Sequence, residues 1–175
     1  STKLHSNACW WWGPFCVIDP LARRFYSFLS ERPRRPIEAR DPYCLGSTVG
    51  SVRSGNEDIA AVVSMRHGGA WERDFDVAVV CDGMGGMAQG REAALIAAST
   101  FLSRVIRAGR YTVPEERLHV ALEAAQHDVY DRLRGRGGTT LSAVYVDRTP
   151  EAWFVHVGDS RVSGLSNGSN PLRQL

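Results

Sequence analysis

Residues 76–90, with the sequence DVAVVCDGMGGMAQG, constrain the fold of this chain more than any other stretch. They begin with a short apolar run rich in β-branched residues, which is typical of a buried strand. The run ends at a carboxylate, Asp82, and the glycines that follow permit a sharp turn and a close approach of the backbone to a ligand: Gly83, Gly85 and Gly86. Beyond the glycines the pattern becomes helical. Asp82 is therefore predicted at the end of a buried strand, where a carboxylate suits a hard cation such as Mg²⁺ or Mn²⁺.

Two other interpretations of this stretch stay open on its residues alone. An Asp-Gly pair is a common turn signal without further function. Gly83, Gly85 and Ala88 also fit the G-x-G-x-x-G/A pattern of a dinucleotide-binding turn between a strand and a helix. That fingerprint requires an acidic residue roughly 20 positions further on. Residues 103–110, SRVIRAGR, contain no acid, which disfavours the dinucleotide site.

Composition limits the class of protein. The 175 residues carry a net charge of +2 and predict one domain that can bury a core. Such a small charge does not indicate a nucleic-acid partner. The four cysteines include no C-x-x-C pair and have no histidine at zinc spacing, so we expect a reducing cytoplasm. We predict a cytoplasmic protein, because no apolar run is long enough for a transmembrane segment and no signal peptide is visible.

The N-terminal part differs from the rest. Residues 1–42 are predicted to be a tail or linker that is disordered or peripheral, with two prolines and three arginines in the stretch ERPRRP. A short helix is predicted from Asp19 and Pro20 through Leu29, since proline suits the first helical position. A second helix is predicted over residues 91–108, and a third begins after Thr112, which forms a capping box with Glu115.

The strands are also predicted from the apolar pattern. A first strand is predicted from Tyr43 to Val52, and the strand from Ile59 to Ser64 is expected to form a hairpin with the strand that ends at Asp82. The inner side of the second helix is predicted to consist of Ala94, Ala97, Phe101, Leu102 and Val105.

Further acidic motifs lie near predicted strand ends. Arg53, Glu57 and Asp58 share one turn before the strand predicted from Ile59. This cluster is either a capped, solvated loop or a site in which the arginine binds phosphate and the acids bind metal. Asp159 belongs to a G-D-S-R motif at the end of a strand predicted over residues 152–157. That motif is either a tight hairpin turn or a third carboxylate at a strand end.

Four motifs follow one another along the chain: R-x-x-N-E-D, V-x-D-G-M-G-G, G-G-T-T and V-G-D-S-R. Their order and spacing resemble those of the metal-dependent serine/threonine protein phosphatases of type 2C, the PPM family, especially its compact bacterial members. The resemblance covers roughly residues 43–165. It implies an α+β fold in which two antiparallel β-sheets pack as a sandwich flanked by helices, in four α-β-β-α layers. Residues 43–175 would then be a partial phosphatase domain that supplies the first half to two-thirds of this fold.

The resemblance also implies roles for individual residues. Asp82 resembles the carboxylate that bridges two Mn²⁺ or Mg²⁺ ions, and Gly83 the glycine whose carbonyl binds one of them. Glu57 and Asp58 match the acidic pair that binds metal or metal-bound water. Arg53 matches the arginine that binds the substrate phosphate, and Asp159 the aspartate of a third, weaker metal site. Gly138 and Thr139 match a structural motif without chemistry of its own.

The implied reaction is hydrolysis of phosphoserine and phosphothreonine in proteins by a metal-activated water. The expected partners are phosphorylated proteins and a cognate serine/threonine kinase, and the chain is expected to be a monomer. The family has two further aspartates downstream of G-D-S-R, and no carboxylate follows Asp159 here. We therefore expect a chain truncated at its C-terminus that binds metal weakly and is poorly active alone. The alternative is a non-catalytic pseudophosphatase that serves as a binding module.

Overall fold

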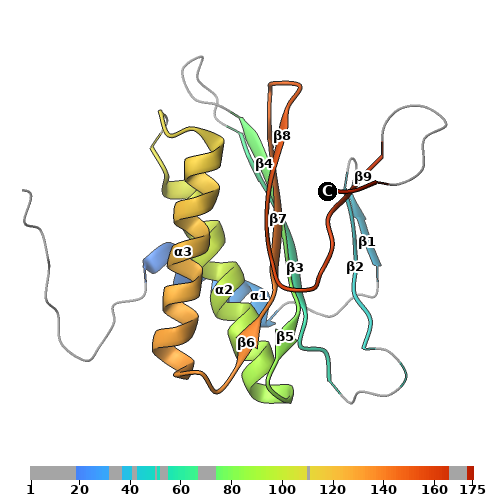
Figure 1. Cartoon of the computed structure of the whole chain (residues 1–175), viewed down its shortest axis with the longest axis vertical. Helices are drawn as coiled ribbons and strands as arrows, with labels where there is room; N and C mark the ends of the chain where they lie inside the picture. The colour runs from blue at the N-terminus through green and yellow to red at the C-terminus, as the bar shows by residue number, and fades with distance from the viewer. Residues whose placement is uncertain are drawn as a thin grey trace, which may run out of the picture.

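A computed structural model of the chain (Figure 1) describes residues 19–31, 37–40, 43–49, 51, 55–66, 74–109, 111–165 and 173–175. Its elements, in chain order, are α1 (Pro20–Glu31), β1 (Ile37–Arg40), β2 (Tyr43–Gly46), β3 (Ile59–Met65), β4 (Phe75–Cys81), β5 (Gly83–Met84), α2 (Met87–Arg107), α3 (Pro114–Leu133), β6 (Gly138–Thr139), β7 (Leu141–Asp147), β8 (Ala152–Val157), β9 (Ser163–Gly164) and β10 (Arg173–Gln174). None of the helices in these ranges is long and apolar enough to cross a membrane.

The centre of the fold is an antiparallel sheet with the strand order β3-β4-β7-β8. The predicted hairpin of β3 and β4 is confirmed, with Ile59 opposite Cys81 and Met65 opposite Phe75. Alternate residues of β4 face the helices and are almost fully buried, as period-two alternation requires. Cys81 ends this buried row, and burial raises the pKa of its thiol to about 12, so it acts as a small apolar side chain.

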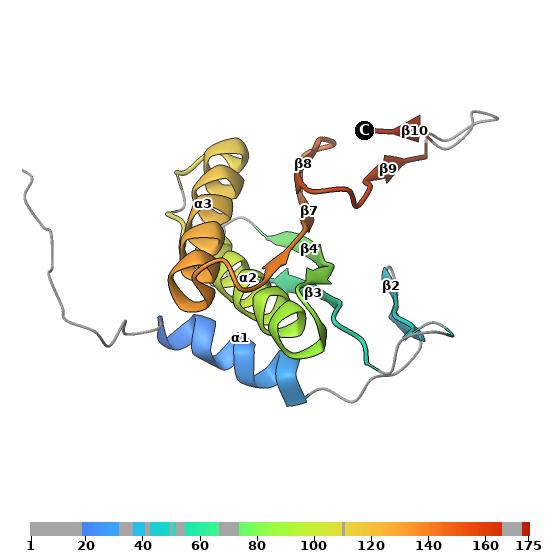
Figure 2. The same cartoon turned by 60° about the horizontal axis from the view of Figure 1, so that its bottom comes forward.

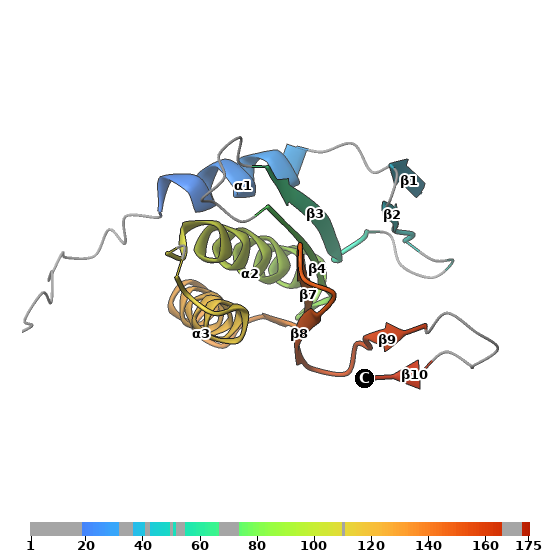
Figure 3. The same cartoon turned by 90° about the horizontal axis from the view of Figure 1, so that it is seen from above.

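Two long helices cover one face of the sheet, and the two-stranded sheets β1-β2 and β9-β10 lie on the other side (Figure 3). The predicted inner positions of α2 are all buried: Ala94, Ala97, Phe101, Leu102 and Val105. On the opposite face of the main sheet, Val80, Val146 and Phe154 are 38 to 46% exposed. The architecture confirms the predicted α+β class in a partial form, with a four-stranded antiparallel sheet covered by helices on one face and short strands on its other side.

A buried arginine ties the start of α3 to the end of α2. Arg117 is 7% exposed and donates to the carbonyl oxygens of Val105 at 2.7 Å and Gly109 at 3.1 Å. Its guanidinium group also lies over the rings of Phe75 and Tyr145, at 5.4 and 5.8 Å from their centroids. Cation–π attraction and carbonyl acceptors compensate the charge for its removal from water.

The capping box predicted at Thr112 is wrong. Helix α3 begins one residue later than that motif requires, because Val113 is the N-cap residue and no side chain caps the helix there. Pro114 occupies the first helical position, and a proline forces the residue before it into an extended conformation. Val113 has φ −67° and ψ 150°, in agreement with this restriction.

Helix α1 falls within the region predicted to be a tail or linker. The predicted helix is confirmed, and it packs against α2 (Figure 2), where Ala22 and Leu29 are buried. Tyr26 donates a hydrogen bond to Glu92 of α2.

Ile37–Arg40 of the same N-terminal region pairs with β2. This strand ends at Gly46, whereas a strand was predicted from Tyr43 to Val52. The domain boundary at residue 42 stays a prediction.

Asp19 fixes the first turn of α1 on α2. Its carboxylate accepts hydrogen bonds from the Leu21 amide at 3.0 Å and the Ser103 hydroxyl, and it pairs with Arg107 at 3.0 Å. Burial alone would raise the pKa of Asp19, but these hydrogen bonds and the charges of Arg107 and Arg104 outweigh it and lower the pKa below the usual 3.8. The folded state is therefore stabilised by this carboxylate above the unfolded pKa, and the contribution is lost as the pH falls through the lowered folded pKa.

We expect Asp19→Asn to lower the free energy of unfolding by about 1 kcal/mol at pH 7 and by nearly nothing at pH 3. Asparagine is as good an N-cap residue as aspartate, so the substitution removes the charge and keeps the cap. Urea unfolding of both proteins at the two pH values measures the difference. Equal stability at pH 7 would show that the charge of Asp19 does not contribute.

Candidate functional site

Four sequence motifs meet at one end of the main sheet. Strand β3 begins after Asp58 and β4 ends before Asp82, while β7 begins after Thr140 and β8 ends before Gly158. Since all these strands are antiparallel neighbours, their named ends lie at the same edge of the sheet. Ile59 pairs with Cys81, so the next residue outward on each strand, Asp58 and Asp82, stands at adjacent strand ends. Both side chains are partly exposed.

The Asp82 backbone is held by the G-G-T-T motif. Its amide donates to Thr140 Oγ1 at 3.1 Å, and its carbonyl oxygen accepts from the Thr140 amide at 2.9 Å and from Thr139 Oγ1 at 3.0 Å. Gly83 pairs with Thr139 in the short β5-β6 ladder. Gly138 and Thr139 were predicted to be structural, and these contacts assign the motif a positioning role. Thr140 was not singled out from the sequence, because its partner Asp82 lies 58 positions away and no local signal indicates the bond.

Glu57 is packed into the turn that follows Asp82. Its side chain is 7% exposed, and a Cβ added at Gly90 would overlap its Oε2 atom and approach the Gly83 carbonyl carbon to 2.9 Å. A Cβ added at Gly83 would overlap the Gly90 carbonyl and lie 2.8 Å from the Glu57 carbonyl oxygen. The acidic loop, the glycine turn and the first turn of α2 therefore touch through their backbones. The Glu57 carboxylate also lies where the α2 dipole favours a negative charge.

Asn56 orders the loop that carries the two acids, a role that the sequence prediction missed. Its Oδ1 accepts from the Asp58 amide at 2.9 Å, which forms an Asx-turn, and its side-chain amide donates to Ser47. Arg91 of α2 reaches the Asn56 carbonyl oxygen at 3.4 Å. The N-x-D spacing is the sequence signal that could have identified this turn.

Asp159 lies at the same edge of the sheet but is exposed. The turn before it is left-handed at Gly158, with φ 109°, and a Cβ there would come within 2.6 Å of Thr140 Cγ2. Ser160 shares a hydrogen bond of 2.7 Å with Thr140 Oγ1, which connects this turn to the residue that holds Asp82. The structure thus brings the G-D-S-R motif next to the G-G-T-T motif.

The structure gives the positions of most of the predicted site residues, and their roles stay predictions. The structure places Asp58, Asp82 and Gly83 together, and it turns Glu57 toward the first turn of α2. Arg53 lies outside the described residues. Among the side chains that are described, no group of three or more His, Cys, Asp and Glu is placed to hold a metal ion. The oxygen atoms of Asp58, Asp82 and the neighbouring backbone are of the kind that Mg²⁺ and Mn²⁺ prefer as ligands.

This chain is similar in structure to solved proteins. No family model and no curated protein matches the sequence. Among solved structures, the PPM Ser-Thr phosphatase MsPP from Mycobacterium smegmatis, in complex with cacodylate, is similar with a TM-score of 0.52 and 27% identity over 72% of this chain and 48% of that one. A Stage II Sporulation E family protein from Thermanaerovibrio acidaminovorans has a TM-score of 0.48 and 29% identity over 66% of this chain and 52% of its own.

The chain spans about half the length of the solved structures that it matches. The TM-score of 0.52 shows that the fold of the matched part of this chain is similar to that of MsPP. From these findings we conclude that the chain has the fold of PPM-type phosphatases in a partial form.

Proposed function

We propose that the chain is the part of a metal-dependent serine/threonine protein phosphatase that carries Asp58, Asp82 and Gly83. The observation that carries this proposal is the strand register that sets Asp58 and Asp82 side by side, within a fold similar to that of a PPM Ser-Thr phosphatase. A phosphatase-type function agrees with the fold. The substrate class, phosphoserine and phosphothreonine in proteins, is inferred from the resemblance and from the name of the similar phosphatase.

In this proposal Asp58 and Asp82 hold Mn²⁺ or Mg²⁺ through their carboxylates, and Gly83 contributes its carbonyl oxygen. When bound, a pair of such ions lowers the pKa of a water and neutralises charge on the phosphoryl oxygens. The buried carboxylate of Glu57 lies against the first turn of α2 and thereby positions the acidic loop that carries Asp58. Asp159 is the candidate for a third, weaker site. Arg53 is the candidate for bidentate binding of the substrate phosphate.

Hydrolysis of a phosphothreonine peptide and of p-nitrophenyl phosphate by this chain tests the proposal. Because this chain is expected to be poorly active alone, we expect slow turnover that requires a high concentration of added Mn²⁺ or Mg²⁺, stops with EDTA and returns with excess metal. Mn²⁺ binding is read independently of turnover, since this paramagnetic ion broadens nearby amide resonances in NMR spectra. We expect broadening at Asp58, Asp82 and Gly83.

Each contrary outcome has a distinct meaning. Turnover that survives EDTA would contradict metal-dependent catalysis, and broadening that avoids the Asp58–Asp82 edge would contradict the assigned ligands. Mn²⁺ binding at that edge without any turnover would favour the non-catalytic binding module.

A further inference from the structure

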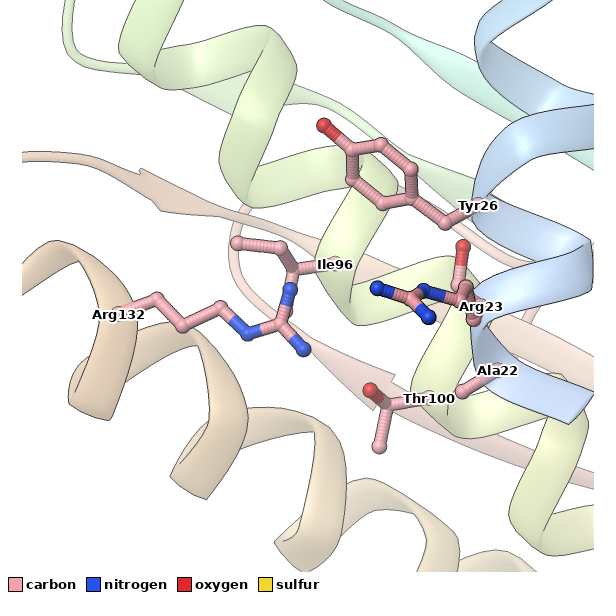
Figure 4. Close-up of a pocket in the computed structure, with 7 residues that line it drawn as sticks. Ala22, Arg23, Tyr26, Ile96, Thr100 and Arg132 are labelled. Carbon is pink, nitrogen blue, oxygen red and sulfur yellow. The ribbon is translucent and has the colours of Figure 1, made fainter. Parts of the chain in front are cut away.

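A pocket separate from the candidate active site lies over α2, between α1 and α3 (Figure 4). It has a volume of about 290 Å³ and is lined by Ala22, Arg23, Tyr26, Ile96, Ser99, Thr100 and Arg132. Ile96 is the lining residue of α2 nearest to its first residue, Met87, and the nine intervening steps correspond to roughly 13 Å along the helix axis. The pocket therefore stands apart from the glycine turn that holds Asp82.

The lining contains two positive charges and no negative one. Arg132 extends from α3 toward the space over α2, and Arg23 reaches the same space from α1 (Figure 4). Neither guanidinium group forms an ion pair with a carboxylate of the described residues. Two like charges that share a pocket repel each other unless an anion lies between them.

Two carboxylates accept hydrogen bonds from hydroxyl groups of the pocket lining. Glu92 accepts the hydrogen bond of Tyr26, and Asp128 accepts from Thr100 Oγ1 at 2.7 Å. Burial and the bond to Glu92 raise the pKa of Tyr26 to about 12, so this ring stays neutral at physiological pH. Tyr26 and Ile96 thus form apolar walls beside the two arginines.

A buried hydroxyl group in the same lining has no partner. Ser99 is 2% exposed, and its Oγ is buried without a hydrogen-bond partner in the described structure. Buried hydroxyl groups in folded proteins are almost always hydrogen-bonded, and each exception calls for an explanation. Ser99 also belongs to the lining of the pocket, so a ligand acceptor bound there would supply the missing partner once the Ser99 hydroxyl group turns toward it.

We propose that this pocket binds a small molecule through a phosphate or carboxylate group. Arg23 and Arg132 would supply charge-assisted hydrogen bonds from two helices, and the Ser99 hydroxyl would donate a third bond. The pocket is close to the lower limit of volume for small-molecule sites, which suits a compact ligand with one anionic group. The bound anion would also hold α1 to α3 across α2.

Titration of the full 175-residue chain with inorganic phosphate and, in a parallel arm, with acetate tests the proposal by NMR. The protein carries Arg53→Gln and Asp82→Asn and is kept metal-free, so that phosphate binding at the candidate active site does not contribute. We expect saturable shifts of the Ser99 and Thr100 amide resonances. The arm with the tighter binding identifies the anionic group.

Arg132→Gln and Arg23→Gln are each expected to weaken phosphate binding by about tenfold or more, as the loss of one charge-assisted contact implies. Arg24→Gln is the matched control, because Arg24 is the exposed neighbour of Arg23 on α1 and does not line the pocket. Unchanged melting temperatures of the variants show that the fold is kept. Absence of saturable shifts with both anions, or equal binding by Arg132→Gln and the Arg24→Gln control, would overturn the proposal and leave the proposed function untouched.

Discussion

Replacing Asp82 by asparagine is expected to lower metal-dependent phosphatase activity by on the order of 100-fold or more. The side chain keeps its shape but loses its charge, and a neutral amide is a much weaker ligand for a hard cation. The backbone bonds of Asp82 to Thr139 and Thr140 do not involve the side chain, so the turn is expected to stay folded. Initial rates at saturating Mn²⁺ measure the effect.

Asp76→Asn is the matched control for this substitution. Asp76 lies near the start of β4, the strand that ends just before Asp82, and it forms a partly exposed ion pair with Arg66 at 2.8 Å. Exposed pairs contribute little to stability, so we expect activity within about twofold of the wild type. Equal losses in both variants would mean that Asp82 acts through the charge of the whole domain and not as a metal ligand.

Gly83→Ala is expected to destabilise the domain by about 3 kcal/mol and to remove phosphatase activity as well. The added methyl group would overlap the Gly90 carbonyl group and press on the Glu57 carbonyl oxygen. These are backbone atoms of α2 and of the acidic loop, which cannot rotate aside as a side chain can. The carbonyl oxygen of residue 83 is kept, so any loss of activity reports the displacement of the turn. Urea unfolding gives the change in free energy.

Gly138→Ala isolates the steric cause. Gly138 belongs to the same β5-β6 ladder, opposite Met84. In the described part of the chain, no atom beyond its two chain neighbours lies within 4 Å of the position that its Cβ would take. We expect this substitution to change the free energy of unfolding by less than about 1 kcal/mol. If both alanine variants lose the same stability, the close approach of Gly83 to Gly90 is not the cause.

The parts of the fold that could be predicted are those encoded by neighbouring residues. The strand that ends at Asp82, its glycine turn and the buried stripe of α2 follow from periodicity, because alternation in strands and the 3.6-residue repeat in helices are local properties. The hairpin of β3 and β4 follows from two apolar runs joined by a loop. The order of the four motifs also carried the resemblance that the similarity to MsPP supports.

The parts that could not be predicted depend on contacts between distant residues. Nothing near Asp19 in the sequence indicates that Ser103 and Arg107 will hold it, and nothing near Glu57 indicates the contact with Gly90. Arg117 looks like a surface cation of an amphipathic helix, yet tertiary packing buries it over two aromatic rings. Such partners follow from the assembled layers and not from any short pattern.

In the sequence, α2 and α3 lie between β4 and β7, which pair with each other in the sheet. This order along the chain has a consequence for folding. Val80 must pair with Ser142, and bringing such distant residues together from an open chain costs loop-closure entropy. The two helices are neighbours in sequence and pack on each other, with Thr100 bonded to Asp128. Once this helical hairpin forms, the ends of the long loop are already close together, so local contacts reduce the entropy lost in closing the centre of the sheet.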